Sequence, residues 1–199
     1  DAGVSVWLDD LNRPMIQDGD LAAYVERGVL GVTTNPTIFA TALAEGEAYT
    51  SQIEKLSGKT VEEVAFALTT EDVRNACDVM MPVFERTNGL DGRVSIEVDP
   101  HLAADTGGTV ELGKRLWAQI DRPNLFIKIP ATVEGLPAIS QTLAEGISVN
   151  VTLIFGLARY DQVMDAYLAG LERALDFLEQ GAATPGHPDH QGTIAVRRQ

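Results

Sequence analysis

The stretch Asn124–Thr132 reads NLFIKIPAT and carries a lysine at the centre of a short apolar run. Its β-branched and aromatic residues, closed by Pro130, predict a buried strand that stops at the proline. Side chains alternate across a strand, so Lys128 shares one face with Phe126 and the three aliphatic side chains share the other. Lys128 is therefore expected to be buried or to lie in a cleft.

A buried lysine has two interpretations. Burial disfavours the charged ammonium and so favours the neutral amine. A neutral amine can attack a carbonyl substrate and form a Schiff base. The structural alternative is a core lysine paired with a carboxylate, and for one isolated lysine this is the more frequent case. The rest of the chain has to decide between them.

Composition excludes several classes of protein. The 199 residues suffice for one large domain with a sizeable core. The net charge of −14 argues against a nucleic-acid or membrane surface, because both need basic residues. No signal peptide or membrane-spanning run is visible, and the single cysteine, Cys77, predicts a reducing cytoplasm. Because the chain starts at Asp1 and not at methionine, we expect a longer gene product.

Strand-like and helix-like patterns alternate along the chain. The predicted strands are Val4–Asp9, Val29–Asn35, Arg93–Asp99, Asn124–Thr132 and Ile147–Leu153. The predicted helices are Asp20–Arg27, residues 37–87 with breaks at Gly46 and Gly58, Thr109–Ile120, Gly135–Glu145, and a long helix from about Leu157 to Gln180. Within the second helical segment, Thr60-x-x-Glu63 predicts a capping box and Thr69-x-x-Asp72 resembles a second cap.

This alternation predicts βα units and a parallel sheet. Each strand has an apolar face and a second face with polar residues, most of them near its C-terminal end: Asp9, Asn35, Glu97, Lys128, Asn150 and Thr152. The pattern favours a (β/α)₈ TIM barrel whose polar groups point into the barrel mouth, incomplete here with about five βα units. An open sheet with one solvated face is the alternative.

Four motifs carry a family resemblance: GVTTNPTIF (Gly31–Phe39), GRVSIEVDP (Gly92–Pro100), NLFIKIPAT and GISVNVTLIF (Gly146–Phe155). In this order they resemble the transaldolase family, in its actinobacterial subgroup, over about Val4 to Leu178. The resemblance implies a TIM barrel of the class I aldolase type. It implies transfer of a dihydroxyacetone unit from sedoheptulose 7-phosphate or fructose 6-phosphate to an aldose phosphate, in the non-oxidative pentose phosphate pathway.

The resemblance also implies catalytic roles. Lys128 would form the Schiff base, and Glu97 would act through a water as general acid and base. Asp9 would take the proton of the C4 hydroxyl as the C3–C4 bond breaks. Asp10 is the alternative to Asp9, but it falls on the opposite strand face. Thr152 would position the catalytic water.

The implied substrate-binding residues are Asn35 and Asn150, which would hold the dihydroxyacetone hydroxyls, together with Thr33. No metal or other cofactor is expected, because the imine itself accepts the electrons of the broken bond. Two other functions stay open. One is a related Schiff-base fructose-6-phosphate aldolase, which releases the ketone unit to water. The other is a truncated, non-catalytic remnant.

The resemblance fails after about Gln180, where the chain reads GAATPGHPDHQGTIAVRRQ. The family would continue with a sixth strand and a phosphate-binding arginine, and neither Arg197 nor Arg198 has that context. His187-x-x-His190 lacks the further ligands of a metal site. We therefore expect a partial barrel over residues 1–181 and an atypical tail over 182–199.

Overall fold

The computed structural model describes residues 3–44 and 46–179. The chain forms two compact units. Unit 1 comprises the residues up to Glu97 together with Gln119–Phe126. Unit 2 comprises Val98–Ala118 together with the residues from Ile127 onward.

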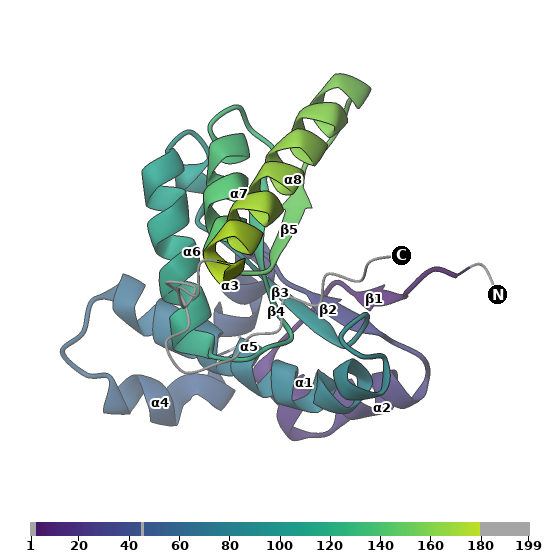
Figure 1. The fold of residues 1–199 in the computed structure, drawn as a ribbon. Coiled ribbons are helices and arrows are strands. Elements are labelled where there is room, and N and C mark those ends of the chain that lie inside the picture. Colours follow the sequence, from purple (N-terminus) through teal and green to yellow (C-terminus); the bar gives the residue numbers. More distant parts are fainter. Residues whose placement is uncertain (1–2, 45, 180–199) are drawn as a thin grey trace. The chain divides into compact units, whose positions relative to one another are not determined.

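Helices and strands alternate as the sequence predicts (Figure 1). The strands are β1 (Trp7–Leu8), β2 (Gly31–Thr33), β3 (Arg93–Glu97), β4 (Leu125–Pro130) and β5 (Val149–Thr152). The helices are α1 (Arg13–Gln17), α2 (Asp20–Glu26), α3 (Pro36–Ala44), α4 (Thr50–Lys55), α5 (Val61–Arg86), α6 (Thr106–Ile120), α7 (Gly135–Ala144) and α8 (Leu157–Glu179). Two short 3₁₀ helices are η1 (Glu47–Tyr49) and η2 (Pro100–Leu102).

The strands form a five-stranded parallel sheet in chain order, β1-β2-β3-β4-β5. Trp7 is in register with Gly31, Thr33 with Ser95, and Lys128 with Asn150. In a doubly wound sheet the strand order reverses at a switch point, and no reversal occurs here. The observed order is that of successive βα units in a barrel and confirms the predicted α/β class as a partial TIM barrel.

The first strand is shorter than predicted. The predicted strand Val4–Asp9 has Val4 and Val6 on its apolar face, which was expected to be buried. They are 75% and 60% exposed, so this expectation is wrong for the structure as described. The reason lies in the pairing, since the ladder with β2 begins only at Trp7.

Helix α5 has one of its two predicted caps. Thr60 and Glu63 form the complete capping box, with the Glu63 N–H donating to Thr60 Oγ1 (3.2 Å) and the Thr60 N–H to Glu63 Oε2 (2.9 Å). The second cap, at Thr69-x-x-Asp72, is wrong, because α5 continues through it. Thr69 Oγ1 donates instead to the Ala65 carbonyl (2.9 Å), a bond typical of a helix interior.

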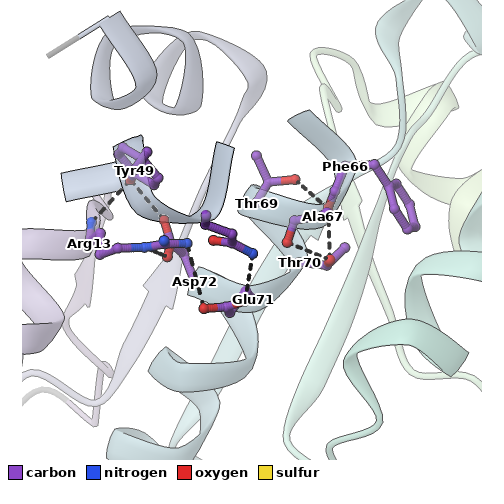
Figure 2. Close-up of polar contacts among 9 residues, drawn as sticks. Arg13, Tyr49, Phe66, Ala67, Thr69, Thr70, Glu71 and Asp72 are labelled. Carbon is purple, nitrogen blue, oxygen red and sulfur yellow. Dashed lines mark hydrogen bonds and ion pairs between the residues drawn. The ribbon is translucent and has the colours of Figure 1, made fainter. Parts of the chain in front are cut away.

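Asp72 belongs to a buried polar cluster in unit 1 that joins α1, η1 and α5 (Figure 2). Arg13 Nε donates to Asp72 Oδ1 (2.8 Å) and the Tyr49 hydroxyl to Asp72 Oδ2 (2.8 Å). The Arg13 guanidinium carbon lies 4.5 Å from the Tyr49 ring centroid. Burial raises the pKa of Asp72, although the hydrogen bonds from Arg13 and Tyr49 lower it. Burial also raises the pKa of Tyr49.

An aromatic layer lies on the polar face of the strands of unit 1. The Trp7 and Phe126 rings stack with centroids 6.4 Å apart, and the Arg93 guanidinium lies 4.8 Å from the Phe126 centroid. Gly31 makes room for the indole, since a Cβ at this position would lie 2.3 Å from a Trp7 ring carbon. Trp7 precedes the candidate residue Asp9 by two positions, so strand alternation puts both on this face.

In unit 2, α8 packs along α7 (Figure 1). The buried residues of α8 are Val163, Gly170 and Ala174. A Cβ at Gly170 would lie 2.7 Å from Leu143 Cβ, so glycine lets the two helices approach closely.

Candidate active site

Four predicted site residues lie at the C-terminal ends of the strands of unit 1. Asp9 directly follows β1, Thr33 ends β2, Asn35 lies two residues further, and Glu97 ends β3. Leu8 is in register with Val32 and Thr33 with Ser95, so Asp9 follows the ladder at the level of Thr33. Residues in register on parallel strands point to the same face. Strand parity therefore puts Asp9, Thr33 and Glu97 on the face of the Trp7 layer.

Asn35 also has a structural role. Its Oδ1 accepts a hydrogen bond from the Ile38 backbone N–H (3.0 Å), so the side chain caps the start of α3. This orients the amide group, and its NH₂ is the part that could donate to a substrate hydroxyl. The structural and the substrate-binding interpretations of Asn35 are therefore compatible.

Asp99, two residues beyond Glu97, is engaged locally. It caps η2 by accepting hydrogen bonds from the His101 backbone N–H (2.9 Å) and ring Nδ1 (2.7 Å). These bonds, the backbone one first, hold the pKa of Asp99 below its usual value. The carboxylate thus stabilises the turn after β3, and Glu97 remains the candidate acid and base of this strand.

The other three site residues lie in unit 2 on the paired strands β4 and β5. Lys128 is directly opposite Asn150, and Pro130 is opposite Thr152. Lys128 is only 8% exposed, and its neighbours Ile127 and Ile129 are fully buried. The predicted buried position of Lys128 is confirmed. The register brings Lys128, Asn150 and Thr152 together on one face of the β4–β5 pair.

Thr152 is distinctive within this group. Its Oγ1 is buried and lacks a hydrogen-bond partner among the described residues. A buried hydroxyl without a partner is unfavourable by about 1–3 kcal/mol. Such an atom is suited to bind a small polar molecule, and a water bound there would satisfy it.

Within residues 3–44 and 46–179, no group of three or more His, Cys, Asp or Glu side chains is arranged to hold a metal ion. Nor does any helix in that part of the chain have the length and apolarity needed to span a membrane. The His187-x-x-His190 pair, the two terminal arginines and the predicted tail 182–199 lie outside the described residues.

Comparison with known proteins gives a match over most of the chain. The model of the Transaldolase/Fructose-6-phosphate aldolase family matches residues 6–188. This chain belongs to that family. It is 62% identical over 177 residues to a transaldolase of Thermobifida fusca and 60% identical over 178 residues to one of Acidothermus cellulolyticus. A transaldolase of Mycolicibacterium paratuberculosis is 60% identical over 176 residues.

These alignments cover 87–88% of this chain but only 47–48% of each relative. The chain therefore spans about half the length of the curated relatives that it matches. Family membership and fold follow directly from the match. The activity of a whole transaldolase is a separate proposal.

Sequence reasoning did not single out one residue near this site. Ser95 is fully buried, lies in register with Thr33 and precedes Glu97 by two residues on the same face. Strand parity alone could have found it, because a serine between Arg93 and Glu97 is polar at a buried position. Its location makes Ser95 part of the surroundings of Glu97.

Proposed function

We propose that this chain provides the Schiff-base half of a transaldolase. The reaction transfers a dihydroxyacetone unit from fructose 6-phosphate or sedoheptulose 7-phosphate to an aldose phosphate, as in the non-oxidative pentose phosphate pathway. Membership of the family and 62% identity to the T. fusca transaldolase support this reaction. The single free cysteine, buried at Cys77, supports a place in the reducing cytoplasm.

The observation that carries the proposal is the environment of Lys128. Lys128 is 8% exposed, and the residues on the other face of its strand are fully buried. Asn150 lies directly opposite Lys128 on β5. A lysine amine can act as a nucleophile toward a carbonyl group. It would attack the ketone carbon, lose water and give an imine, and Asn150 would hold a hydroxyl of the bound ketose.

The proposed proton transfers divide between two carboxylates. When the C3–C4 bond breaks, its electron pair moves into the imine and Asp9 takes the proton of the C4 hydroxyl, which becomes the leaving aldehyde. Glu97 moves protons through a water during formation and hydrolysis of the imine, and Thr152 would hold that water. Two carboxylates can serve such different steps when their surroundings differ.

Borohydride trapping tests the covalent residue. The protein to use is a chimera in which residues 1–179 of this chain are continued by the part of the T. fusca transaldolase that follows its match. Incubation with fructose 6-phosphate and borohydride should attach a reduced three-carbon unit to Lys128, located by peptide mass spectrometry. Lys128→Ala should remove the label. The control Lys114→Ala should keep it, because this substitution removes only the ion pair between Lys114 and Glu145. Labelling that survives Lys128→Ala would contradict the assignment.

A second candidate function is a fructose-6-phosphate aldolase, which the description of the matching family also names. The two activities differ in the fate of the three-carbon unit. A transaldolase needs an acceptor aldehyde, so turnover of fructose 6-phosphate by the chimera should depend on erythrose 4-phosphate. Equal turnover without the acceptor, with release of dihydroxyacetone, would favour the aldolase.

A further inference from the structure

The loop between β1 and α1 comprises residues 9–12 and begins with Asp9. β1 pairs with β2 only at Trp7 and Leu8, so this ladder ends before Asp9. Asp9 itself is exposed, so few neighbouring atoms hold its side chain. The position of the Asp9 backbone therefore depends on what holds the loop on its C-terminal side.

The C-terminal part of this loop is held firmly. Leu11 is fully buried. Asn12 Oδ1 accepts a hydrogen bond from the Met15 backbone N–H (2.9 Å) and so caps α1. Arg13, the first residue of α1, is 5% exposed and belongs to the buried polar cluster with Tyr49 and Asp72. The loop thus leads from an exposed carboxylate to a buried anchor.

The buried polar cluster holds Arg13 by its backbone and by its side chain (Figure 2). The Arg13 backbone N–H donates to the Tyr49 hydroxyl (3.2 Å), and this hydroxyl donates to Asp72 Oδ2 (2.8 Å). Arg13 Nε donates to Asp72 Oδ1 (2.8 Å). The Arg13 guanidinium also lies over the Tyr49 ring. These contacts together fix the start of α1 relative to η1 and α5.

Stability alone is a poor explanation for this cluster. Its three residues are at most 5% exposed, and charged groups lose their hydration when they are buried. Apolar side chains of similar volume would often be as stable at such a place. Buried hydrogen-bonded groups favour one geometry, because a displaced arrangement leaves a polar atom without its partner. The cluster is therefore suited to fix the position of the attached loop.

We propose that the buried polar cluster positions Asp9 to take the proton of the C4 hydroxyl, so that its three members are positioning residues. The inference rests on the proposed function, in which Asp9 acts when the C3–C4 bond breaks. The cluster acts on Asp9 through the loop and needs no contact with the substrate. A displacement of about 1 Å in a reacting group can slow a reaction about 10²-fold. A loosened cluster should therefore slow carbon–carbon cleavage and leave imine formation unchanged.

Tyr49→Phe tests this in the chimera defined for the trapping experiment. It removes one oxygen atom, which accepts from the Arg13 N–H and donates to Asp72, while the ring and both charges remain. Formation of the imine with fructose 6-phosphate, followed by rapid quench in borohydride, should change less than about 2-fold. Release of glyceraldehyde 3-phosphate in a single turnover should slow at least about 10-fold.

A double variant separates the positioning of Asp9 from a general loss of structure. Asp9→Ala removes the group that the cluster is proposed to position. In that background, Tyr49→Phe should change single-turnover cleavage less than about 2-fold, because substitutions that act through the same group are not additive. A merely structural role of Tyr49 would slow cleavage by the same factor in both backgrounds.

Two control variants match the change in chemistry and the change in stability. Tyr24→Phe removes a hydroxyl from a tyrosine of α2 that contacts Arg27 and lies outside the cluster. It should change each step less than about 2-fold. Met80→Ala removes a buried side chain of α5 about two turns beyond Asp72. It should destabilise the protein without changing the ratio of the two rates.

Hydrogen exchange of backbone amides reads the anchoring of the loop without any activity. Tyr49→Phe should speed exchange of residues 10–13 at least about 10-fold and leave β3 unchanged. Unchanged exchange in the loop, equal slowing of imine formation and cleavage, or the same factor in both backgrounds would each overturn the proposal. These three results leave the proposed function standing. If the unsubstituted chimera formed no imine, the proposed function would fail and the positioning role with it.

Discussion

At the scale of single residues, Asp9 and Glu97 should have separable roles. Asp9 directly follows β1 and Glu97 ends β3, and strand alternation puts both on the same face. Asp9 is exposed, whereas Glu97 is partly buried. In the chimera, Asp9→Ala should slow carbon–carbon cleavage by about 10²–10⁴-fold while imine formation continues. Glu97→Ala should slow imine formation and hydrolysis instead. Rapid-quench measurement of imine formation beside steady-state turnover distinguishes them, and equal defects in both steps for both variants would contradict the assignment.

The Arg13–Asp72 pair gives a prediction about stability. Arg13→Met leaves the buried Asp72 carboxylate without its counter-charge. Breaking a buried ion pair in this way typically lowers the free energy of unfolding by about 3–5 kcal/mol. Urea unfolding of the chimera measures it. Lys59→Met is the control, because the Lys59–Glu63 pair is exposed and should contribute less than about 1 kcal/mol.

The same pair predicts a pH dependence. Burial already raises the pKa of Asp72 in the folded protein, and loss of Arg13 should raise it further. A carboxylic acid whose pKa is higher in the folded than in the unfolded state makes the folded protein less stable as pH rises from the unfolded pKa towards the folded pKa. The reason is that the charged form is disfavoured only in the folded state. The defect of Arg13→Met should therefore be smaller near pH 4 than at pH 7. A defect that is equal at both pH values would contradict this, because it would show that loss of Arg13 does not raise the pKa of Asp72.

At the scale of elements, the close contact between α7 and α8 depends on a glycine, Gly170, at the point where the helices meet. Gly170→Leu would place a Cβ 2.7 Å from Leu143 Cβ and should separate the helices. Overpacking of this kind typically destabilises by about 1–3 kcal/mol. Ala169→Leu adds the same side chain to the neighbouring exposed position and should have a much smaller effect in the same urea unfolding experiment. Equal effects of the two substitutions would mean that helix propensity and not the contact decides.

At the scale of the whole molecule, the ends of the sheet should limit what the isolated chain can do. The exposed apolar residues beside the two terminal strands, β1 and β5, include Val4, Val6, Leu153 and Phe155. Burying one such side chain is worth about 1.5–3 kcal/mol, against a net stability of about 5–15 kcal/mol for a domain. The 199-residue chain alone should therefore aggregate or melt without cooperativity, and should not turn over fructose 6-phosphate with erythrose 4-phosphate. A monomeric, cooperative and active chain would contradict this.

Local patterns in the sequence determined most elements and the positions of the candidate site residues. Alternation in NLFIKIPAT predicted β4 and the buried Lys128, because a strand with one apolar face has a simple period of two. Thr60 and Glu63 predicted the start of α5, because a capping box uses only residues three apart. Helix α1 was not predicted, since it has only five residues and no full turn of apolar periodicity.

The tertiary structure decided what contacts between distant residues control. Asp72 has the local pattern of a helix cap, yet it pairs with Arg13, 59 positions earlier, and α5 runs on past it. The apolar residues of α8 have one helical period in the sequence, but α7 covers only the part of the helix around Gly170. A period shows which residues share a face. Only packing shows which faces are covered, because burial depends on neighbours far away in the chain.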